Sequence, residues 1–149
     1  ELRNPTTLAL AGIATQMLQT NGTLTCSFPT APAGLYYIVV KQRNSIETWS
    51  SSAQPIGNTQ LNYDFSSAAS KAFGANLVAV ETGVYALYSG DINVDGNIDN
   101  IDFSLWETDA SQFAAGDFGT DLNGDGNVDN IDFSLWESNS SNFISTISP

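Results

Sequence analysis

The chain has 149 residues, of which 42% are apolar and 13% charged, so its apolar content suits one globular domain or two small ones and is too high for full disorder. It contains no run of about 18 apolar residues, which excludes a membrane-spanning helix on length. The net charge of −12 is unevenly placed, because residues 1–90 hold four acids and four bases whereas residues 91–149 hold twelve acids and no base. Phosphate and anionic lipid are repelled by such a segment, so nucleic acid and membrane surfaces are poor candidate partners.

Two residue types limit the chemistry further. Histidine is absent and Cys26 is the only cysteine, which excludes zinc sites, imidazole bases and an internal disulfide. Cys26 lies in an alternating apolar stretch, a position that favours a small buried thiol over a catalytic one. The chain opens on Glu1 rather than Met, and we expect the start of the gene product to lie upstream or to have been removed.

The first part of the chain has the pattern of short β-strands separated by turns. Residues 34–43 are rich in β-branched and aromatic residues and form the clearest predicted strand. Residues 17–20 and 23–28 flank Asn21-Gly22, a dipeptide that favours a tight hairpin turn. We expect further strands at residues 7–10, 46–49, 60–65, 77–80 and 84–88, and one or two helical turns at residues 66–73.

These strands predict an Ig-like antiparallel β-sandwich over residues 1–89, in a protein that is mostly β with a small α module at residues 90–149. The sandwich is near the lower size limit for such a domain, so we expect it to lack a strand that another segment or another chain supplies. Residues 142–147 could be such a strand, docked elsewhere.

The acidic part of the chain contains an internal repeat. Residues 91–107 recur as residues 121–137 with fourteen of seventeen positions identical. Each copy matches Asp-x-Asn-x-Asp-Gly-x-x-x-x-x-Asp, the twelve-residue calcium loop with oxygen ligands at positions 1, 3, 5, 7, 9 and 12. Gly96 and Gly126 take position 6, where the chain turns sharply.

Calcium needs this spacing because a short loop must curl around the ion to supply six to eight oxygens. Position 7 contributes its backbone carbonyl, and position 9 binds directly or through water. The predicted ligands of two Ca²⁺ ions are Asp91, Asn93, Asp95, Asn97, Asp99 and Asp102 in the first loop, and Asp121, Asn123, Asp125, Asn127, Asp129 and Asp132 in the second.

Solvated acidic turns are the alternative to a metal site, but the five fixed positions coincide by chance about once in several million windows. Magnesium fits less well, since it demands tighter octahedral geometry. Four carboxylates per empty loop repel one another, so we expect the metal to be part of the fold. Free calcium is millimolar outside cells, which favours an extracellular setting.

A helix is expected after each loop, capped by Asp99 or Asn100 and by Asp129 or Asn130. The alternating pattern of residues 101–105 leaves a strand open as an alternative. Trp106 and Trp136 are either platforms that stack on sugars or, as their equivalent positions in a small module favour, core or partner-facing residues.

The paired loops resemble the duplicated calcium repeats of type I dockerin domains, whose loops also end in Asp. The resemblance covers residues 90–137 and implies a small, secreted bacterial module that folds around two calcium ions and binds a cohesin domain. The preceding residues resemble the β-rich regions of large bacterial surface proteins. Cohesin recognition does not carry over, because Asn100-Ile101 and Asn130-Ile131 replace the usual hydroxyl pair and no Lys or Arg follows Lys71.

The sequence therefore predicts a non-catalytic, calcium-binding structural or assembly protein at the bacterial cell surface, with like subunits as partners in a homo-oligomer or filament. The alternative is a dockerin-type adaptor that anchors a secreted polysaccharide-degrading enzyme to a cohesin-like domain. An enzyme within these residues is the least favoured hypothesis, because Glu47, Asp64 and Glu81 form no motif and the other acids are committed to the loops.

Overall fold

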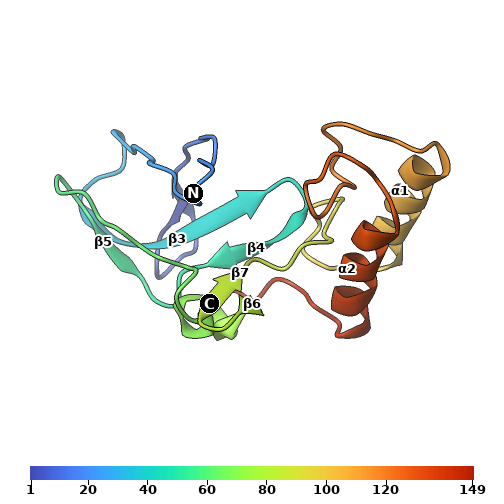
Figure 1. Ribbon diagram of the computed structural model, residues 1–149. Helices are drawn as coiled ribbons and strands as arrows, with labels where there is room; N and C mark the ends of the chain where they lie inside the picture. The colour runs from blue at the N-terminus through green and yellow to red at the C-terminus, as the bar shows by residue number, and fades with distance from the viewer.

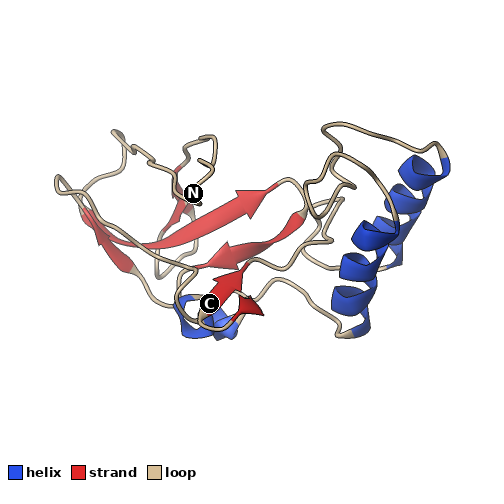
Figure 2. Ribbon diagram, viewed as in Figure 1, coloured by secondary structure: helices blue, strands red, loops and turns tan.

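The computed structural model describes residues 1–149, with a β-rich part and a part that holds two helices (Figure 1). Antiparallel strands and two helices lie in separate regions of the molecule (Figure 2). The elements are β1 (Leu2–Arg3), β2 (Leu10–Gly12), β3 (Gly34–Gln42), β4 (Ser45–Trp49), β5 (Gln54–Ile56), η1 (Ala69–Lys71), η2 (Phe73–Ala75), β6 (Val78–Glu81), β7 (Val84–Ala86), α1 (Asn100–Ser111) and α2 (Asn130–Ser141).

Strand β3 is the centre of a five-stranded antiparallel sheet in which it pairs with β1, β4 and β5, while β2 pairs with β1. Its β-branched and aromatic residues suit a pleated, half-buried surface. Val39 lies opposite Trp49 of β4, and both side chains are buried. Strands β6 and β7 form a separate two-stranded hairpin. The prediction of a mostly β fold with antiparallel sheets and a minor helical part is confirmed.

Several predicted strands differ from the observed ones. The turn at Asn21-Gly22 forms, with Gly22 donating its N–H to Gln19 O at 2.9 Å, but residues 17–20 and 23–28 form no strands beside it. The predicted strand at residues 60–65 is absent, and the third partner of β3 is instead β5. Cys26 is only partly buried rather than in the core. Local turn chemistry is therefore satisfied here without a buried face to hold the flanking strands.

Helices α1 and α2 have 12 residues each, and no helix of the protein has the length and apolarity needed to cross a membrane. Asp99 caps α1 by accepting the Ile101 N–H, and Asp129 does the same for α2. The two helices pack through four aromatic rings with centroids 5.1 to 6.1 Å apart, those of Phe103, Trp106, Phe133 and Trp136. The helical prediction for the residues after each loop is thus confirmed over the strand alternative.

After α2 the chain returns to the β-rich part, where the C-terminus lies (Figure 1). The predicted strand at residues 142–147 is wrong: this segment makes a single bridge, between Ser145 and Asn97 of the same chain. Ser145 O also accepts a bond of 2.9 Å from Asn76 Nδ2. Gly74 permits the close approach, because a Cβ there would lie 2.7 Å from Ile147 Cγ2. The tail is therefore occupied within its own chain.

Candidate metal centre

Position 1 of each loop organises the turn around it through its carboxylate. Asp91 accepts the N–H of Asp95 on Oδ1 at 3.0 Å and that of Gly96 on Oδ2 at 3.1 Å. Asp121 likewise accepts the N–H of Gly126 on Oδ2 at 2.9 Å. Gly96 and Gly126 have φ of 92° and 88°, a left-handed conformation that favours glycine at this position. Both loops therefore curl around their first aspartate.

Position 12 closes each loop back onto its start. Asp102 Oδ1 accepts the N–H groups of Ile92 at 2.7 Å and Asn93 at 3.1 Å, while its Oδ2 accepts that of Asp99 at 2.9 Å. Asp132 repeats these contacts at the same distances, with the N–H groups of Leu122, Asn123 and Asp129. The bond to the residue at position 9 completes a capping box, so one carboxylate serves both loop and helix.

The middle of each loop lies toward solvent. Asp95 Oδ1 accepts the Asn97 N–H at 3.0 Å, and Asn93 Oδ1 accepts the Asp95 N–H at 3.0 Å. The second loop has the same two bonds at 2.9 Å and 2.7 Å, from Asn127 and Asp125. The side-chain amide of Asn93 holds the pKa of Asp95 below its usual range, and the amide of Asn123 does so for Asp125. These two exposed carboxylates therefore stay ionised.

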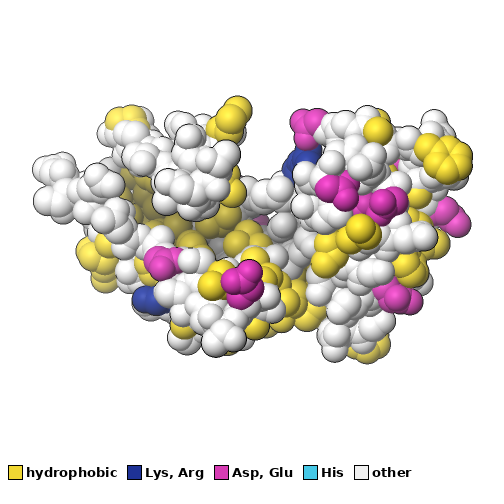
Figure 3. Space-filling view, in the orientation of Figure 1, with side chains coloured by type: hydrophobic (Ala, Val, Ile, Leu, Met, Phe, Trp, Pro, Cys, Tyr) yellow, Lys and Arg dark blue, Asp and Glu magenta, His cyan; other side chains and the backbone are white.

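Four carboxylates of the module are buried without a cationic partner. The exposed fractions are 1% for Asp91, 0% for Asp102, 3% for Asp121 and 0% for Asp132. Every ion pair in the structure involves other acids, namely Glu1, Glu47 and Asp117. Acidic side chains also gather on the surface of the helical part (Figure 3). A buried carboxylate is costly unless it is paired or binds a metal.

In the first loop, burial disfavours the charged form of two of these carboxylates. Burial raises the pKa of Asp91 to about 6, and the charges of Asp102 and Asp95 add to the rise, against the N–H groups that lower it. Burial also raises the pKa of Asp102, although three N–H groups act in the opposite direction. The folded loop therefore penalises the charged forms of its own aspartates, and a cation between them would relieve that penalty.

The donor chemistry of the loops fits calcium, but the structure gathers no group of three or more acidic side chains that could hold a metal ion as they stand. Asp and Asn oxygens and a backbone carbonyl are the hard ligands that Ca²⁺ takes. A carboxylate offers about four lone-pair sites, and Asp91 uses two on N–H groups and Asp102 three. Coordination would use the lone-pair sites that these N–H groups leave free.

The turn between β3 and β4 joins the sheet to both loops. Asn44 O accepts the Gly90 N–H at 2.8 Å, directly before the first loop. Its buried side chain donates from Nδ2 to Gly119 O at 3.0 Å and to Asp121 O, at the start of the second loop, at 3.1 Å. An ion pair between Arg43 and Asp117 lies beside this junction. The sequence did not predict this role of Asn44, because the only local signal there is a position between two expected strands.

The two loops have different neighbours. A cavity of about 290 Å³ lies between the sheet and the first loop and is lined by Lys41 and Glu47 on one side and Asp91 and Asp95 on the other. The Lys41 ammonium is 2.7 Å from Glu47 Oε2, so its charge is committed to the sheet rather than to the loop. Thr146 Oγ1 is buried without a hydrogen-bond partner in the same region. The first loop is thus sheltered by the rest of the chain.

Each tryptophan crosses to the opposite repeat. Trp106 Nε1 donates to Asp129 O at 3.2 Å, and Trp136 Nε1 donates to Asp99 O at 3.0 Å. Both accepting residues occupy position 9 of a loop, which ties each helix to the loop of the other repeat. Trp136 is buried and packs with Ile46 of β4, as expected of a core residue, whereas Trp106 is only partly covered.

Comparison of this chain with known protein families, with characterised proteins and with solved structures finds no match.

Proposed function

We propose that this chain is a non-catalytic, extracellular calcium-binding subunit of a surface structure or fibre, in which two Ca²⁺ ions rigidify the acidic repeats. The observation that carries the proposal is the burial of four carboxylates that have no cationic partner in the chain. Their arrangement recurs in both repeats with matching hydrogen bonds. A divalent cation in each loop is the charge that would balance them.

In this proposal the first ion is held by Asp91, Asn93, Asp95, the carbonyl of Asn97 and Asp102. The second is held by the equivalent residues thirty positions later, and Asp99 and Asp129 add a direct or water-mediated ligand while they cap their helices. Calcium supplies charge balance rather than chemistry. Asn44 then connects the rigid loops to the sheet, because it is hydrogen-bonded to the segments that begin both loops.

The β-rich part suits an assembly role. We propose that the five-stranded sheet and the β6–β7 hairpin are the two layers of an incomplete Ig-like sandwich. Large apolar side chains such as Ile13, Met17 and Leu35 stay exposed on this part, and Figure 3 shows an apolar hollow there. Apolar surface that is not covered within the chain marks sites of protein contact.

Calorimetric titration of the full chain with CaCl₂, followed by thermal unfolding with and without EGTA, tests the proposal. We expect two Ca²⁺ per chain and a lower Tm in EGTA, because the metal binds only the folded loops. The double variant Asp95→Asn with Asp125→Asn should weaken binding at both sites, whereas Glu137→Gln, an acid outside the loops, should not. Absence of binding and of any Tm shift at about 1 mM calcium would overturn the proposal.

Electron microscopy of the same samples tests the assembly role. We expect fibres or ordered oligomers in calcium and their loss in EGTA, since the chelator removes the rigid connection between the loops and the sheet. Calcium binding without any assembly would leave the metal sites standing and refute the structural role.

A further inference from the structure

The two repeats are related by an approximate twofold symmetry that extends beyond the loops. The N–H of Ile98 donates to Ile144 O at 3.1 Å, and the N–H of Val128, its equivalent, donates to Ala114 O at 3.0 Å. Isolated bridges join Asn97 to Ser145 and Asn127 to Ala115 in the same way. Each loop thus pairs with the segment that follows the helix of the other repeat, which creates two equivalent faces.

The sheet covers one of these faces. Ile98 and Trp136 lie on it and form a buried cluster with Ile46 of β4, against which Tyr88 also packs. Gly90 brings the chain close to this face, because a Cβ there would lie 3.0 Å from Ile98 Cγ2. Apolar side chains of a β-rich segment therefore dock on one repeat face within this chain.

The equivalent face carries no such cover. It contains a cavity of about 300 Å³ that is mostly apolar, with Trp106, Ala110, Phe113, Val128 and Ile131 in its lining. Phe113 is 91% exposed, and its repeat equivalent Phe143 is 89% exposed, so the sheet leaves this position open on the other face as well. We call this surface the Trp106 face. Its apolar lining, and the sheet that buries Ile98 and Trp136 on the equivalent face, point to a docked protein segment.

The surface area of the whole chain agrees with missing contacts. The chain exposes 8739 Å², whereas a monomer of 15.9 kDa exposes about 7,400 Å² by the usual scaling. The excess of about 1,300 Å² approaches the roughly 1,600 Å² that a subunit gives up when it forms two standard interfaces at about 800 Å² each. An assembly with one donating and one accepting surface per subunit would account for it.

Charge decides what can occupy the Trp106 face. Residues 91–149 carry twelve acids and no base, and two calcium ions would leave a net charge of −8, so two copies of this face repel each other. An anionic segment is therefore excluded as the occupant, whereas an uncharged segment meets no such repulsion. Residues 4–40 of this chain contain no charged residue at all.

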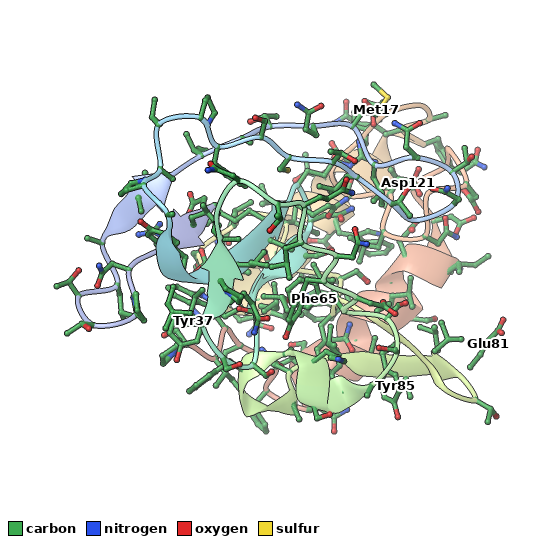
Figure 4. The ribbon with its side chains drawn as sticks, turned by 90° about the vertical axis from the view of Figure 1, so that its left-hand side faces the viewer. Met17, Tyr37, Phe65, Glu81, Tyr85 and Asp121 are labelled. Atoms are coloured by element: carbon green, nitrogen blue, oxygen red, sulfur yellow. The ribbon has the colours of Figure 1, made fainter.

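Within that uncharged stretch, residues 13–24 form an arm with free apolar side chains. The arm belongs to no strand or helix, and its hydrogen bonds join residues 17–23 only to one another. Met17 is 82% exposed and projects from the molecule (Figure 4), and Ile13, Leu18 and Leu24 are exposed as well. No hydrogen bond therefore joins this arm to the rest of the chain, and its large apolar side chains stay uncovered.

We propose that the arm of one copy docks on the Trp106 face of a second copy, in a head-to-tail contact. Donor and acceptor lie on different parts of the subunit, so the contact repeats from copy to copy and builds a filament if it does not close into a ring. The inference deepens the proposed assembly function and rests on it.

The test measures self-association of the full chain in calcium by analytical ultracentrifugation. Phe113→Asp should weaken association at least about tenfold, because it places a charge in the docking face. Phe143→Asp is the matched control, since Phe143 is the repeat equivalent, 89% exposed with a φ of 54°, and lies outside the Trp106 face. It should change association less than about twofold. Equal effects of the two variants would overturn the proposal.

A mixing experiment identifies the donor. Met17→Asp blocks the arm but keeps the face, and Phe113→Asp blocks the face but keeps the arm. Each should be monomeric alone, and the two together should form a 1:1 dimer that cannot grow. The self-docking is refuted if that dimer does not form. It is equally refuted if the calcium-loaded wild type stays monomeric, or if such a monomer binds a cohesin domain. Calorimetry on the same samples reports calcium binding separately, so loss of this inference is distinguishable from loss of the metal sites.

Discussion

Replacement of Asp102 by alanine separates the observed task of position 12, which is to hold the backbone, from its proposed task, which is to bind Ca²⁺. The carboxylate is fully buried and accepts three backbone N–H groups, so its removal leaves three donors without partners. At about 1 kcal/mol for each orphaned donor, the free energy of unfolding should fall by about 3 kcal/mol without calcium. At about 1 mM calcium, a site with a Kd of about 10 µM adds about 2.7 kcal/mol, so the total loss becomes about 6 kcal/mol.

Urea unfolding of wild type and Asp102→Ala measures the loss of backbone hydrogen bonds in EGTA and the added loss of calcium binding in calcium. Asp95→Ala is the companion variant, because Asp95 is exposed and its loss should cost little in EGTA but remove the calcium-dependent part. It also keeps the test usable if Asp102→Ala fails to fold. An equal loss for Asp102→Ala in EGTA and in calcium would mean that this carboxylate is only a structural cap, and the reasoning would be refuted.

Four further outcomes are expected. Asn44→Ala should lower the free energy of unfolding by about 2 kcal/mol, because Gly119 O and Asp121 O lose a buried donor, whereas the exposed Asn58→Ala should change it by less than about 0.5 kcal/mol in the same urea titration. Val94→Gly should stabilise the chain by about 1 kcal/mol in thermal unfolding, because Val94 has a φ of 58° where the second repeat has Gly124 at 78°; a destabilisation would contradict this. Burial raises the pKa of Asp91 to about 6, which favours the neutral carboxyl in the folded chain, so the calcium-free protein should lose stability as pH rises from about 4 through about 6. Protons should likewise weaken calcium binding below about pH 6 in calorimetric titrations, and an affinity independent of pH between about 5 and 7 would count against the assignment.

Local sequence signals determined most of the helical part. The residue types predict a helix capped by Asp99 or Asn100, and in the structure Asp99 is the cap and forms a capping box with Asp102. Position 6 of each loop has the left-handed backbone that its glycine suggests. These features depend on residues within one loop, so a short window of sequence contains the information.

Long-range partners were beyond such a window. The pattern of residues 142–147 suited a strand, yet Thr146 N donates to Gly96 O at 2.7 Å within the same chain, a pairing fifty residues distant in sequence. The strand expected at residues 60–65 does not form, and β5 pairs with β3 instead. Which segment pairs with β3 depends on the whole sheet and not on a short window of sequence. The sequence around Asn44 contains no motif that predicts its hydrogen bond to Asp121 O. The metal itself stays a prediction from the loop pattern.

The crossed pairing between the repeats has a consequence for how the chain tolerates trimming. The segment that shelters the first loop belongs to the last residues of the chain, as the bond from Ile98 N to Ile144 O shows. A protease that removes residues 142–149 would uncover the loop at residue 91 and spare the loop beside the cut, whose own shelter is Ala114. Loss of the last residues of the chain would thus expose first the loop that is more distant from them in sequence.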